Sequence, residues 1–304
     1  MLLLLEQVLN GLQLGVMLFL MAAGLTLVFG IMGLINLAHG SMYMLGAFVG
    51  ATVTQATGSF VVGLLVAMPA AALVGWAVEL AVLRRLYARD HLDQVLATFG
   101  LLLFFNALVQ LLWGRQPLFM DVPEALSGSV ELIPGVPYPA YRIAIIATGL
   151  IVAMLLYLLI SRTRLGMQIR ASASNREMAE AIGVNTPMLY SLVFALGAGL
   201  AGLAGLMAAP ILAVETGMGE SILIETFVVI VIGGLGSIRG AFLGALLVGL
   251  VDTLGRAFLP TLLRTVLPAA TADGAGASLS SMGIYILMAA VLLWRPRGLF
   301  PAPA

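Results

Sequence analysis

Charged side chains are concentrated in one polar segment, residues 161–187, within an otherwise apolar sequence. The segment reads SRTRLGMQIRASASNREMAEAIGVNTP, and the apolar stretches on both sides of it are long enough to cross a bilayer. Its ionic groups suit ion pairing and protein recognition, and they are Arg162, Arg164, Arg170, Arg176, Glu177 and Glu180. We therefore expect this segment to be presented to a binding partner.

The segment also contains a predicted short helix, from about Ser174 to Ile182. Ser174 or Asn175 is the expected N-cap, Glu177 lies near the positive end of the helix dipole, and Gly183 is a natural C-terminal stop. One face would be apolar, formed by Met178, Ala181 and Ile182. Such a helix can lie on lipid or dock into a partner's groove, and its mixed charge disfavours lipid. A solvated connector without a partner is the third interpretation.

A second group of polar residues interrupts the apolar stretch 24–50, which is rich in glycine. These residues are Asn36, His39, Ser41 and Tyr43. Polar groups at membrane depth are costly unless they face protein or a water-filled cavity, so this break is a candidate part of a translocation pathway. A plain turn between two spans, with His39 at the level of the lipid headgroups, is the equal alternative.

A third candidate, residues 229–250, reads VIVIGGLGSIRGAFLGALLVGL and resembles the first break. In both, an apolar helix ends in glycines, a single residue of basic type follows, and a helix of small residues resumes. Transporters are often built from repeats with discontinuous helices, so Gly233, Gly234 and Gly236 are also pathway candidates. The glycine spacing does not match a dinucleotide-binding fingerprint.

The amino-acid composition indicates the kind of fold that positions these residues. Of 304 residues, 62% are hydrophobic and 9% are charged, and the mean hydropathy is +1.12, whereas soluble domains carry roughly 25% charged residues. The chain is therefore a polytopic membrane protein, and we expect residues 1–304 to form a single integral domain. Its net charge is zero and its arginines lie in short loops rather than in a basic tail, which excludes a nucleic-acid partner.

The residue types that are missing restrict the chemistry further. Every basic residue is arginine, so neither a P-loop lysine nor a Schiff-base lysine exists, and any ATP must be bound by another chain. Cysteine is absent and histidine occurs twice, so we expect no metal site and no cofactor. Among the few charges inside spans, Glu79 can snorkel or pair with nearby arginines.

The expected fold is an all-α transmembrane bundle of about nine spans, with eight to ten possible. It includes discontinuous glycine-rich helices and a cytoplasmic coupling helix. The predicted spans are 8–31, 37–57, 60–83, 95–114, 141–161, 186–209, 222–236, 240–259 and 279–294. Arginines follow the third, fifth, seventh and ninth spans, which predicts a cytoplasmic polar segment and C-terminus and an external N-terminus. Residues 115–140 would then be an external proline-rich loop.

Three separated motifs resemble one family of permeases. They are NLAHGSMYMLGAF (36–48), TRLGMQIRASASNREMAEAIGVN (163–185) and VIGGLGSIRGAFLGALLVG (231–249). Together they are similar to the LivH-type permeases of ABC importers for branched-chain amino acids, in order and over nearly the whole chain. Permeases for urea and short amides share these motifs, so the resemblance leaves the substrate more open than the family.

The resemblance implies an inner-membrane transport subunit rather than an enzyme. Its partners would be a second, homologous permease of the LivM type, two cytoplasmic ABC ATPase subunits, a periplasmic substrate-binding protein and membrane lipid. Residues 162–185 would form the coupling segment that contacts an ATPase. The positions carried over from the family are Arg170, Arg176, Glu177, Glu180, Ala181 and Gly183. The match is partial, because Ile182 replaces the second alanine of the family's pattern.

Two other classes of protein compete with this interpretation. An ATP-independent channel or facilitator would also have uncharged spans and glycine-rich breaks. A membrane-embedded enzyme is disfavoured, because the sequence has two histidines, no cysteine and no close pair of acids. Retention of an ATPase subunit on purification distinguishes the importer from the facilitator.

Overall fold

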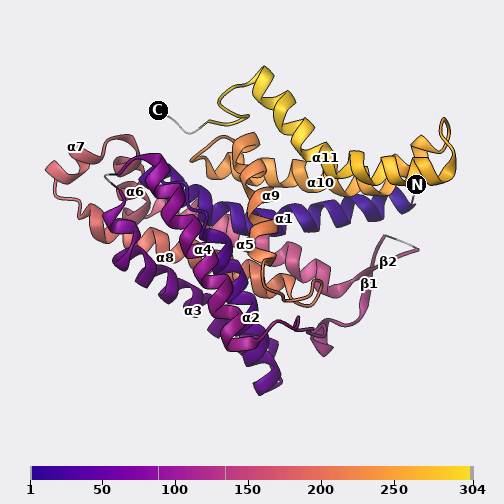
Figure 1. Cartoon of the computed structure of the whole chain (residues 1–304), viewed down its shortest axis with the longest axis horizontal. Helices are drawn as coiled ribbons and strands as arrows, with labels where there is room; N and C mark the ends of the chain where they lie inside the picture. Colours follow the sequence, from indigo (N-terminus) through magenta and orange to yellow (C-terminus); the bar gives the residue numbers. More distant parts are fainter. Residues whose placement is uncertain (1, 88, 134, 302–304) are drawn as a thin grey trace.

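The computed structural model describes residues 2–87, 89–133 and 135–301, so positions 1, 88, 134 and 302–304 of the expected domain lie outside it. Helices form nearly all of it (Figure 1). In chain order the helices before the polar segment are α1 (Leu2–Met32), α2 (His39–Thr57), α3 (Phe60–Ala81), η1 (Leu83–Arg85), α4 (His91–Trp113), η2 (Glu124–Leu126) and α5 (Ala140–Arg162). The helices within and after the polar segment are α6 (Arg164–Ser174), α7 (Arg176–Ala181), α8 (Thr186–Ala208), α9 (Met218–Gly233), α10 (Ile238–Leu263) and α11 (Ala269–Trp294).

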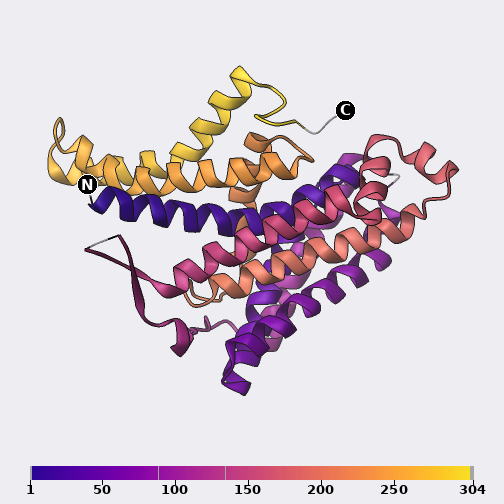
Figure 2. The ribbon, with the colours of Figure 1, turned by 180° about the vertical axis from the view of Figure 1, so that it is seen from behind.

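The long helix α1 is the centre of the bundle, with α10 along one side and α8 along another. Both views show α6 and α7 at the end of the molecule opposite the N-terminus of α1 (Figures 1 and 2). Close crossings depend on small residues: a Cβ added to Gly46 of α2 would lie 2.2 Å from the Cα of Gly202 in α8. Backbones in such crossings approach closely enough for extensive van der Waals packing, which drives helix association in membranes.

All nine expected spans are helical, but seven helices of the described residues satisfy the length and apolarity needed to cross a membrane. They are α1, α3 with η1, α4, α5, α8, α10 and α11. The other two differ from the prediction for physical reasons. Helix α9 has 16 residues, fewer than the roughly 20 that cross a bilayer, and α2 is less apolar because it carries His39, Gln55 and several threonines.

Side-chain caps explain where several helices begin. Ser59 accepts a hydrogen bond from the Val62 amide at the start of α3, and Ser237 accepts one from the Gly240 amide at the start of α10. Such bonds satisfy amides that have no partner inside the helix. Because these caps are local, α3 and α10 begin within two residues of the predicted spans.

The proline-rich segment 115–140 contains the one departure from an all-α fold in the described residues. Strands β1 (Ser129–Ile133) and β2 (Val136–Pro139) pair as an antiparallel hairpin, and Tyr138 on β2 is buried. Leu118 also pairs with Val214 of the α8–α9 connection. Proline disfavours a long helix here, as expected, and the hairpin within this connection is a departure from the predicted all-α fold.

Candidate functional site

The polar segment forms two short helices, where one was predicted. Helix α7 corresponds to the predicted helix, and α6 is additional. The side chain of Asn175 accepts a hydrogen bond of 2.9 Å from the Met178 amide, so Asn175 rather than Ser174 is the N-cap of α7. Gly183 follows the helix with φ +92°, the left-handed conformation of a glycine stop.

Helix α6 is held against the end of α5. The guanidinium of Arg170 donates a hydrogen bond to the carbonyl of Ile160, and a Cβ added to Gly166 would lie 2.3 Å from the same carbonyl oxygen. Thr163 caps α6 by accepting a hydrogen bond from the Gly166 amide. Arg170 therefore fixes α6 against α5, and α7 forms the outer surface of the polar segment.

Helix α7 is tied to the start of α8 through Glu180. Its carboxylate pairs with Arg176 at 3.0 Å and accepts a hydrogen bond from the hydroxyl of Thr186. The Thr186 hydroxyl, and then the Arg176 guanidinium, lower the pKa of Glu180 below its ordinary value. The same ion pair raises the pKa of Arg176. Glu180 is thus ionised at neutral pH and fixes α7 relative to α8.

The outer face of α7 is exposed and partly apolar. Met178 is 60% exposed and Ile182, which follows the helix, is 71% exposed. Glu177, Ala181 and Gly183 are exposed beside them. Large apolar side chains in this position, rimmed by charges, are typical of a surface that binds another protein.

A buried carboxylate lies where α3 meets α8. Glu79 has a side chain that is 0% exposed, and it accepts hydrogen bonds from Arg84, from Tyr87 at 2.9 Å and from Ser191 at 2.6 Å. The pairing of Glu79 with Arg84 confirms one of the two predicted roles of this residue. Since each ionic or hydroxyl group has a partner, the network can remain in an apolar environment.

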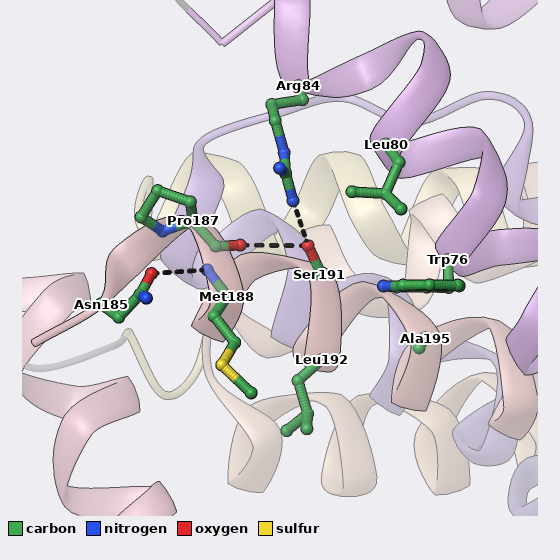
Figure 3. A pocket seen from close by; sticks show the side chains of 9 residues that line it. All are labelled: Trp76, Leu80, Arg84, Asn185, Pro187, Met188, Ser191, Leu192 and Ala195. Carbon is green, nitrogen blue, oxygen red and sulfur yellow. Dashed lines mark hydrogen bonds between the residues drawn. The ribbon is translucent and has the colours of Figure 1, made fainter.

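A groove of about 520 Å³ opens beside this network, between α3 and α8 (Figure 3). Trp76 lies on its α3 side and Leu192 on its α8 side, while Arg84 donates to Ser191 at one end. The lining contains no acid–base pair or nucleophile arranged for catalysis. Its chemistry suits apolar contact.

The first glycine-rich break turns back into the bundle. Helix α1 ends at Met32, and Gly33 follows it with φ +63° and an amide that donates a hydrogen bond to the carbonyl of Phe29. After five more residues, the Nε2 atom of His39 lies 3.2 Å from the carbonyl oxygen of Met21. Met21 precedes the end of α1 by about 16 Å along the helix axis, at 1.5 Å per residue. The ring of His39 therefore lies beside the middle of α1.

The four polar residues of this break are at most 2% exposed, and they are Asn36, His39, Ser41 and Tyr43. Asn36 holds the turn, because its side-chain oxygen accepts a hydrogen bond of 3.1 Å from the Ala38 amide. The Nδ2 atom of Asn36 and the hydroxyl of Ser41 are buried without a hydrogen-bond partner in the described protein. The four polar side chains of the break are therefore buried, and the Asn36 amide and the Ser41 hydroxyl could still form hydrogen bonds.

The second break separates α9 from α10 and is covered by the C-terminal tail. The amide of Phe300 bonds to the carbonyl of Gly233 at 2.9 Å, and a Cβ on Gly234 would lie 2.9 Å from the Phe300 oxygen. Gly236 has φ +79° and contacts Gly30 of α1. Glycine is required here because the tail and α1 approach the backbone directly.

Helix α1 contacts the two breaks at different levels along its axis. His39 contacts Gly24, whereas Gly236 contacts Gly30, about 9 Å further along α1 at 1.5 Å per residue. The predicted pathway residues therefore line one helix at two levels, and their role in a pathway stays a prediction.

Sequence reasoning missed three partners of these sites, which are Tyr87, Tyr190 and Ser191. Tyr190 is 2% exposed and contacts Tyr87 and Arg176 through its ring. The only signal in the sequence was the occurrence of tyrosines close to the predicted inner ends of apolar spans. Across residues 2–87, 89–133 and 135–301, no group of three or more histidines and acids could hold a metal ion.

The helical fold, with two glycine-rich breaks and an exposed polar segment, defines a polytopic membrane protein of the permease class. Residues 7–292 match the family described as the permease component of branched-chain amino acid transport systems, and the chain belongs to this family. No solved structure matches the chain.

Curated relatives resemble the chain along nearly its whole length. The high-affinity branched-chain amino acid transport system permease protein BraD of Pseudomonas aeruginosa is 32% identical, over 98% of this chain and 96% of the relative. The corresponding permease LivH of Escherichia coli is 30% identical over the same shares. A probable LivH from Methanocaldococcus jannaschii is 27% identical, over 93% of this chain and 88% of the relative.

Proposed function

We propose that this chain is a permease subunit of an ABC importer and forms part of the pathway for branched-chain amino acids. The complex would contain a second permease of the LivM type, two cytoplasmic ABC ATPases and a periplasmic binding protein that delivers the substrate. The chain would lie in the inner membrane, with the N-terminus outside and both the polar segment and the C-terminus in the cytoplasm.

The observation that carries this proposal is the surface of α7. Met178 and Ile182 are exposed and apolar, and the hydrogen bond from the Thr186 hydroxyl to Glu180 holds the helix in a defined orientation on α8. A short amphipathic helix of this kind suits docking into a groove of another protein. The absence of lysine from the sequence supports a separate ATPase subunit as that protein.

The coupling residues in this proposal have different tasks. Glu177, Ala181 and Gly183 are exposed and would contact the ATPase. Arg170 and the Arg176–Glu180 pair would orient the segment. The pathway would pass the two breaks when the bundle opens, because the unpartnered polar groups of Asn36 and Ser41 in the first break could then bind water or the charged ends of an amino acid.

Co-purification tests the proposal directly. The chain is expressed with its candidate partner permease, ATPase subunits and binding protein, and the complex is reconstituted in proteoliposomes. We expect the ATPase subunits to remain bound, and leucine uptake to require both ATP and the binding protein. Uptake without ATP and without a retained ATPase would instead identify a facilitator.

The substrate class is tested in the same vesicles. We expect unlabelled isoleucine and valine to compete with labelled leucine, whereas urea and acetamide do not. Competition by urea and acetamide alone would assign the chain to the amide-transporting branch suggested by the shared motifs. The relatives named above favour branched-chain amino acids, because their names refer to these substrates.

A further inference from the structure

Tyr190, near the start of α8, is contacted from two sides through its ring. The guanidinium carbon of Arg176 in α7 lies 5.2 Å from the ring centroid. The ring of Tyr87, in the α3–α4 connection, packs against it edge to face with centroids 5.5 Å apart. Cation–π and aromatic contacts both depend on ring orientation, so a movement of Arg176 acts on the ring of Tyr190.

The hydroxyl of Tyr190 reaches the first glycine-rich break. It donates a hydrogen bond of 3.3 Å to the carbonyl oxygen of Ile31, in the last turn of α1, two residues before Gly33. Carbonyls at a helix end lack partners within the helix, and in a membrane they must find them elsewhere in the protein. This hydroxyl supplies such a partner where α1 stops.

The bond from Tyr190 to Ile31 is longer than the usual O–H···O distance of about 2.8 Å. On α4, the Thr98 hydroxyl lies 3.5 Å from the carbonyl oxygen of Ile35, at the outer limit of a hydrogen bond, and its shorter bond is to Gln94. The carbonyls around the break are therefore held loosely by neighbouring helices. A small shift of α8 would strengthen or break the contact with Ile31.

At its other end, Tyr190 is connected to the exposed surface of α7. Arg176 is held over the ring by Glu180, and Glu180 is held by Thr186 at the start of α8. A protein that binds Met178 and Ile182 would rotate or pull α7, and with it Arg176. The contacts thus run without interruption from α7 through Tyr190 to the break after α1.

We propose that Tyr190 is a positioning residue that transmits the movement of α7 to the break after α1. The proposal rests on the proposed function, because the movement is supplied by an ATPase bound to α7. Such transmission requires a contact whose free energy differs between two states of the helix bundle. The bond from Tyr190 to Ile31 is that contact, and the ring contact with Arg176 controls it.

A reporter cysteine at the break makes the proposal measurable. The sequence has no cysteine, so Leu37→Cys introduces a single thiol at a half-buried position of the break. The complete complex, with ATPases, second permease and binding protein, is reconstituted in lipid nanodiscs. The rate of thiol modification by a water-soluble maleimide is then compared with ADP and with a non-hydrolysable ATP analogue.

We expect the nucleotide to change the modification rate in the Leu37→Cys parent. Adding Tyr190→Phe keeps the ring and removes the hydroxyl, and it should reduce this nucleotide effect by about 2- to 30-fold, the range for residues that modulate coupling. ATPase retention and the rate in ADP should remain those of the parent, which a purely structural role would not predict.

The matched control is Tyr141→Phe. Tyr141 is also buried, and its hydroxyl bonds at 2.9 Å to the Met207 carbonyl at the far end of α8. This variant should retain the full nucleotide effect. Arg176→Gln is the second test, because it breaks the ring contact at a side chain that is 47% exposed and so disturbs folding least.

The outcomes separate the two proposals. A full nucleotide effect in Tyr190→Phe or in Arg176→Gln, with the ATPases retained, overturns the role of Tyr190 and leaves the importer intact. Equal losses in Tyr190→Phe and Tyr141→Phe also overturn it, because any buried tyrosine would then suffice. A parent complex that retains no ATPase overturns the importer proposal and the role of Tyr190 together.

Discussion

The carboxylate of Glu79 accepts a hydrogen bond of 2.6 Å from the hydroxyl of Ser191, and this bond joins α3 to α8 inside the bundle. Arg84 and Tyr87 complete the set of donors around the same carboxylate. The α3–α8 contact is therefore held by a satisfied polar cluster as well as by apolar packing.

Glu79→Gln tests this cluster. The amide has the shape of the carboxylate but lacks its charge, so Arg84 loses its counter-ion. The NH₂ group of the glutamine also faces one of the groups that donate hydrogen bonds to Glu79. We expect a loss of about 1–3 kcal/mol of stability, the cost of leaving a buried polar partner unsatisfied. The midpoint of thermal unfolding in detergent measures it, and Glu177→Gln, at an exposed carboxylate, is the control. Equal midpoints in the two variants would contradict the structural role of Glu79.

Gly46→Ala tests the crossing of α2 and α8. The added methyl would lie 2.2 Å from the Cα of Gly202, so the two backbones must separate. Overpacking of this kind costs about 1–3 kcal/mol or more. Gly100→Ala is the matched control, since no atom lies within 4 Å of a Cβ there. Gly46→Ala should lower the unfolding midpoint, whereas Gly100→Ala should leave it unchanged or raise it.

Gly183→Ala tests the importance of the glycine that ends α7. No neighbour lies within 4 Å of a Cβ at this position, but φ is +92°, so a side chain costs about 1–2 kcal/mol through backbone strain alone. We expect Gly183→Ala to weaken ATPase retention while membrane insertion is unchanged. Gly183→Asn should be milder, because asparagine tolerates this conformation. An alanine variant that retains the ATPase like the parent would show that the end of α7 does not matter for binding.

The pKa of Glu180 should respond more to Thr186 than to Arg176. Both partners favour the carboxylate and lower the pKa of Glu180, with the Thr186 hydroxyl as the larger cause. The resulting stability is present above the pKa of the unfolded chain, ordinarily near 4.5, and it is lost as pH falls through the lower folded value. Carboxyl NMR titration should show a larger rise in Thr186→Val than in Arg176→Gln. The reverse order would contradict this assignment.

Ser41→Ala separates a transport role from a structural one. The buried hydroxyl of Ser41 has no partner in the described protein, and an unsatisfied group costs about 1–3 kcal/mol, so its removal should not lower the unfolding midpoint. If Ser41 serves the pathway, leucine uptake should nevertheless fall. Ser280→Ala, which removes a bond of 2.7 Å to Gly276, is the contrasting control. Unchanged uptake in Ser41→Ala would remove this residue from the pathway.

Local features of the fold were predictable because their causes lie within a few residues. Asn175 and Gly183 bound α7 through contacts and dihedral angles of neighbouring residues. Helix α6 was missed because it is held in place by α5 through the bond from Arg170 to Ile160, a contact that the local sequence does not indicate. The hairpin in 115–140 was missed because proline excludes a long helix without indicating which strands pair.

The candidate sites were predictable to different degrees. The polar types of Asn36 and His39 marked the first break, but only the packed structure places the ring of His39 against Met21. The contacts of Tyr190 involve Arg176, Tyr87 and Ile31, which are distant along the chain or belong to other helices. No local pattern encodes such partners.

The sequence by itself determined that this protein is a membrane-embedded helical protein without a lysine or cysteine of its own, because composition and apolar runs suffice for that conclusion. Its motifs also indicated the family. Tertiary structure alone decided that the break after α1 turns back into the bundle and that Tyr190 links it to α7. The physical reason is that the partners of buried polar groups are chosen by helix packing, which brings together residues as distant as Ile31 and Tyr190.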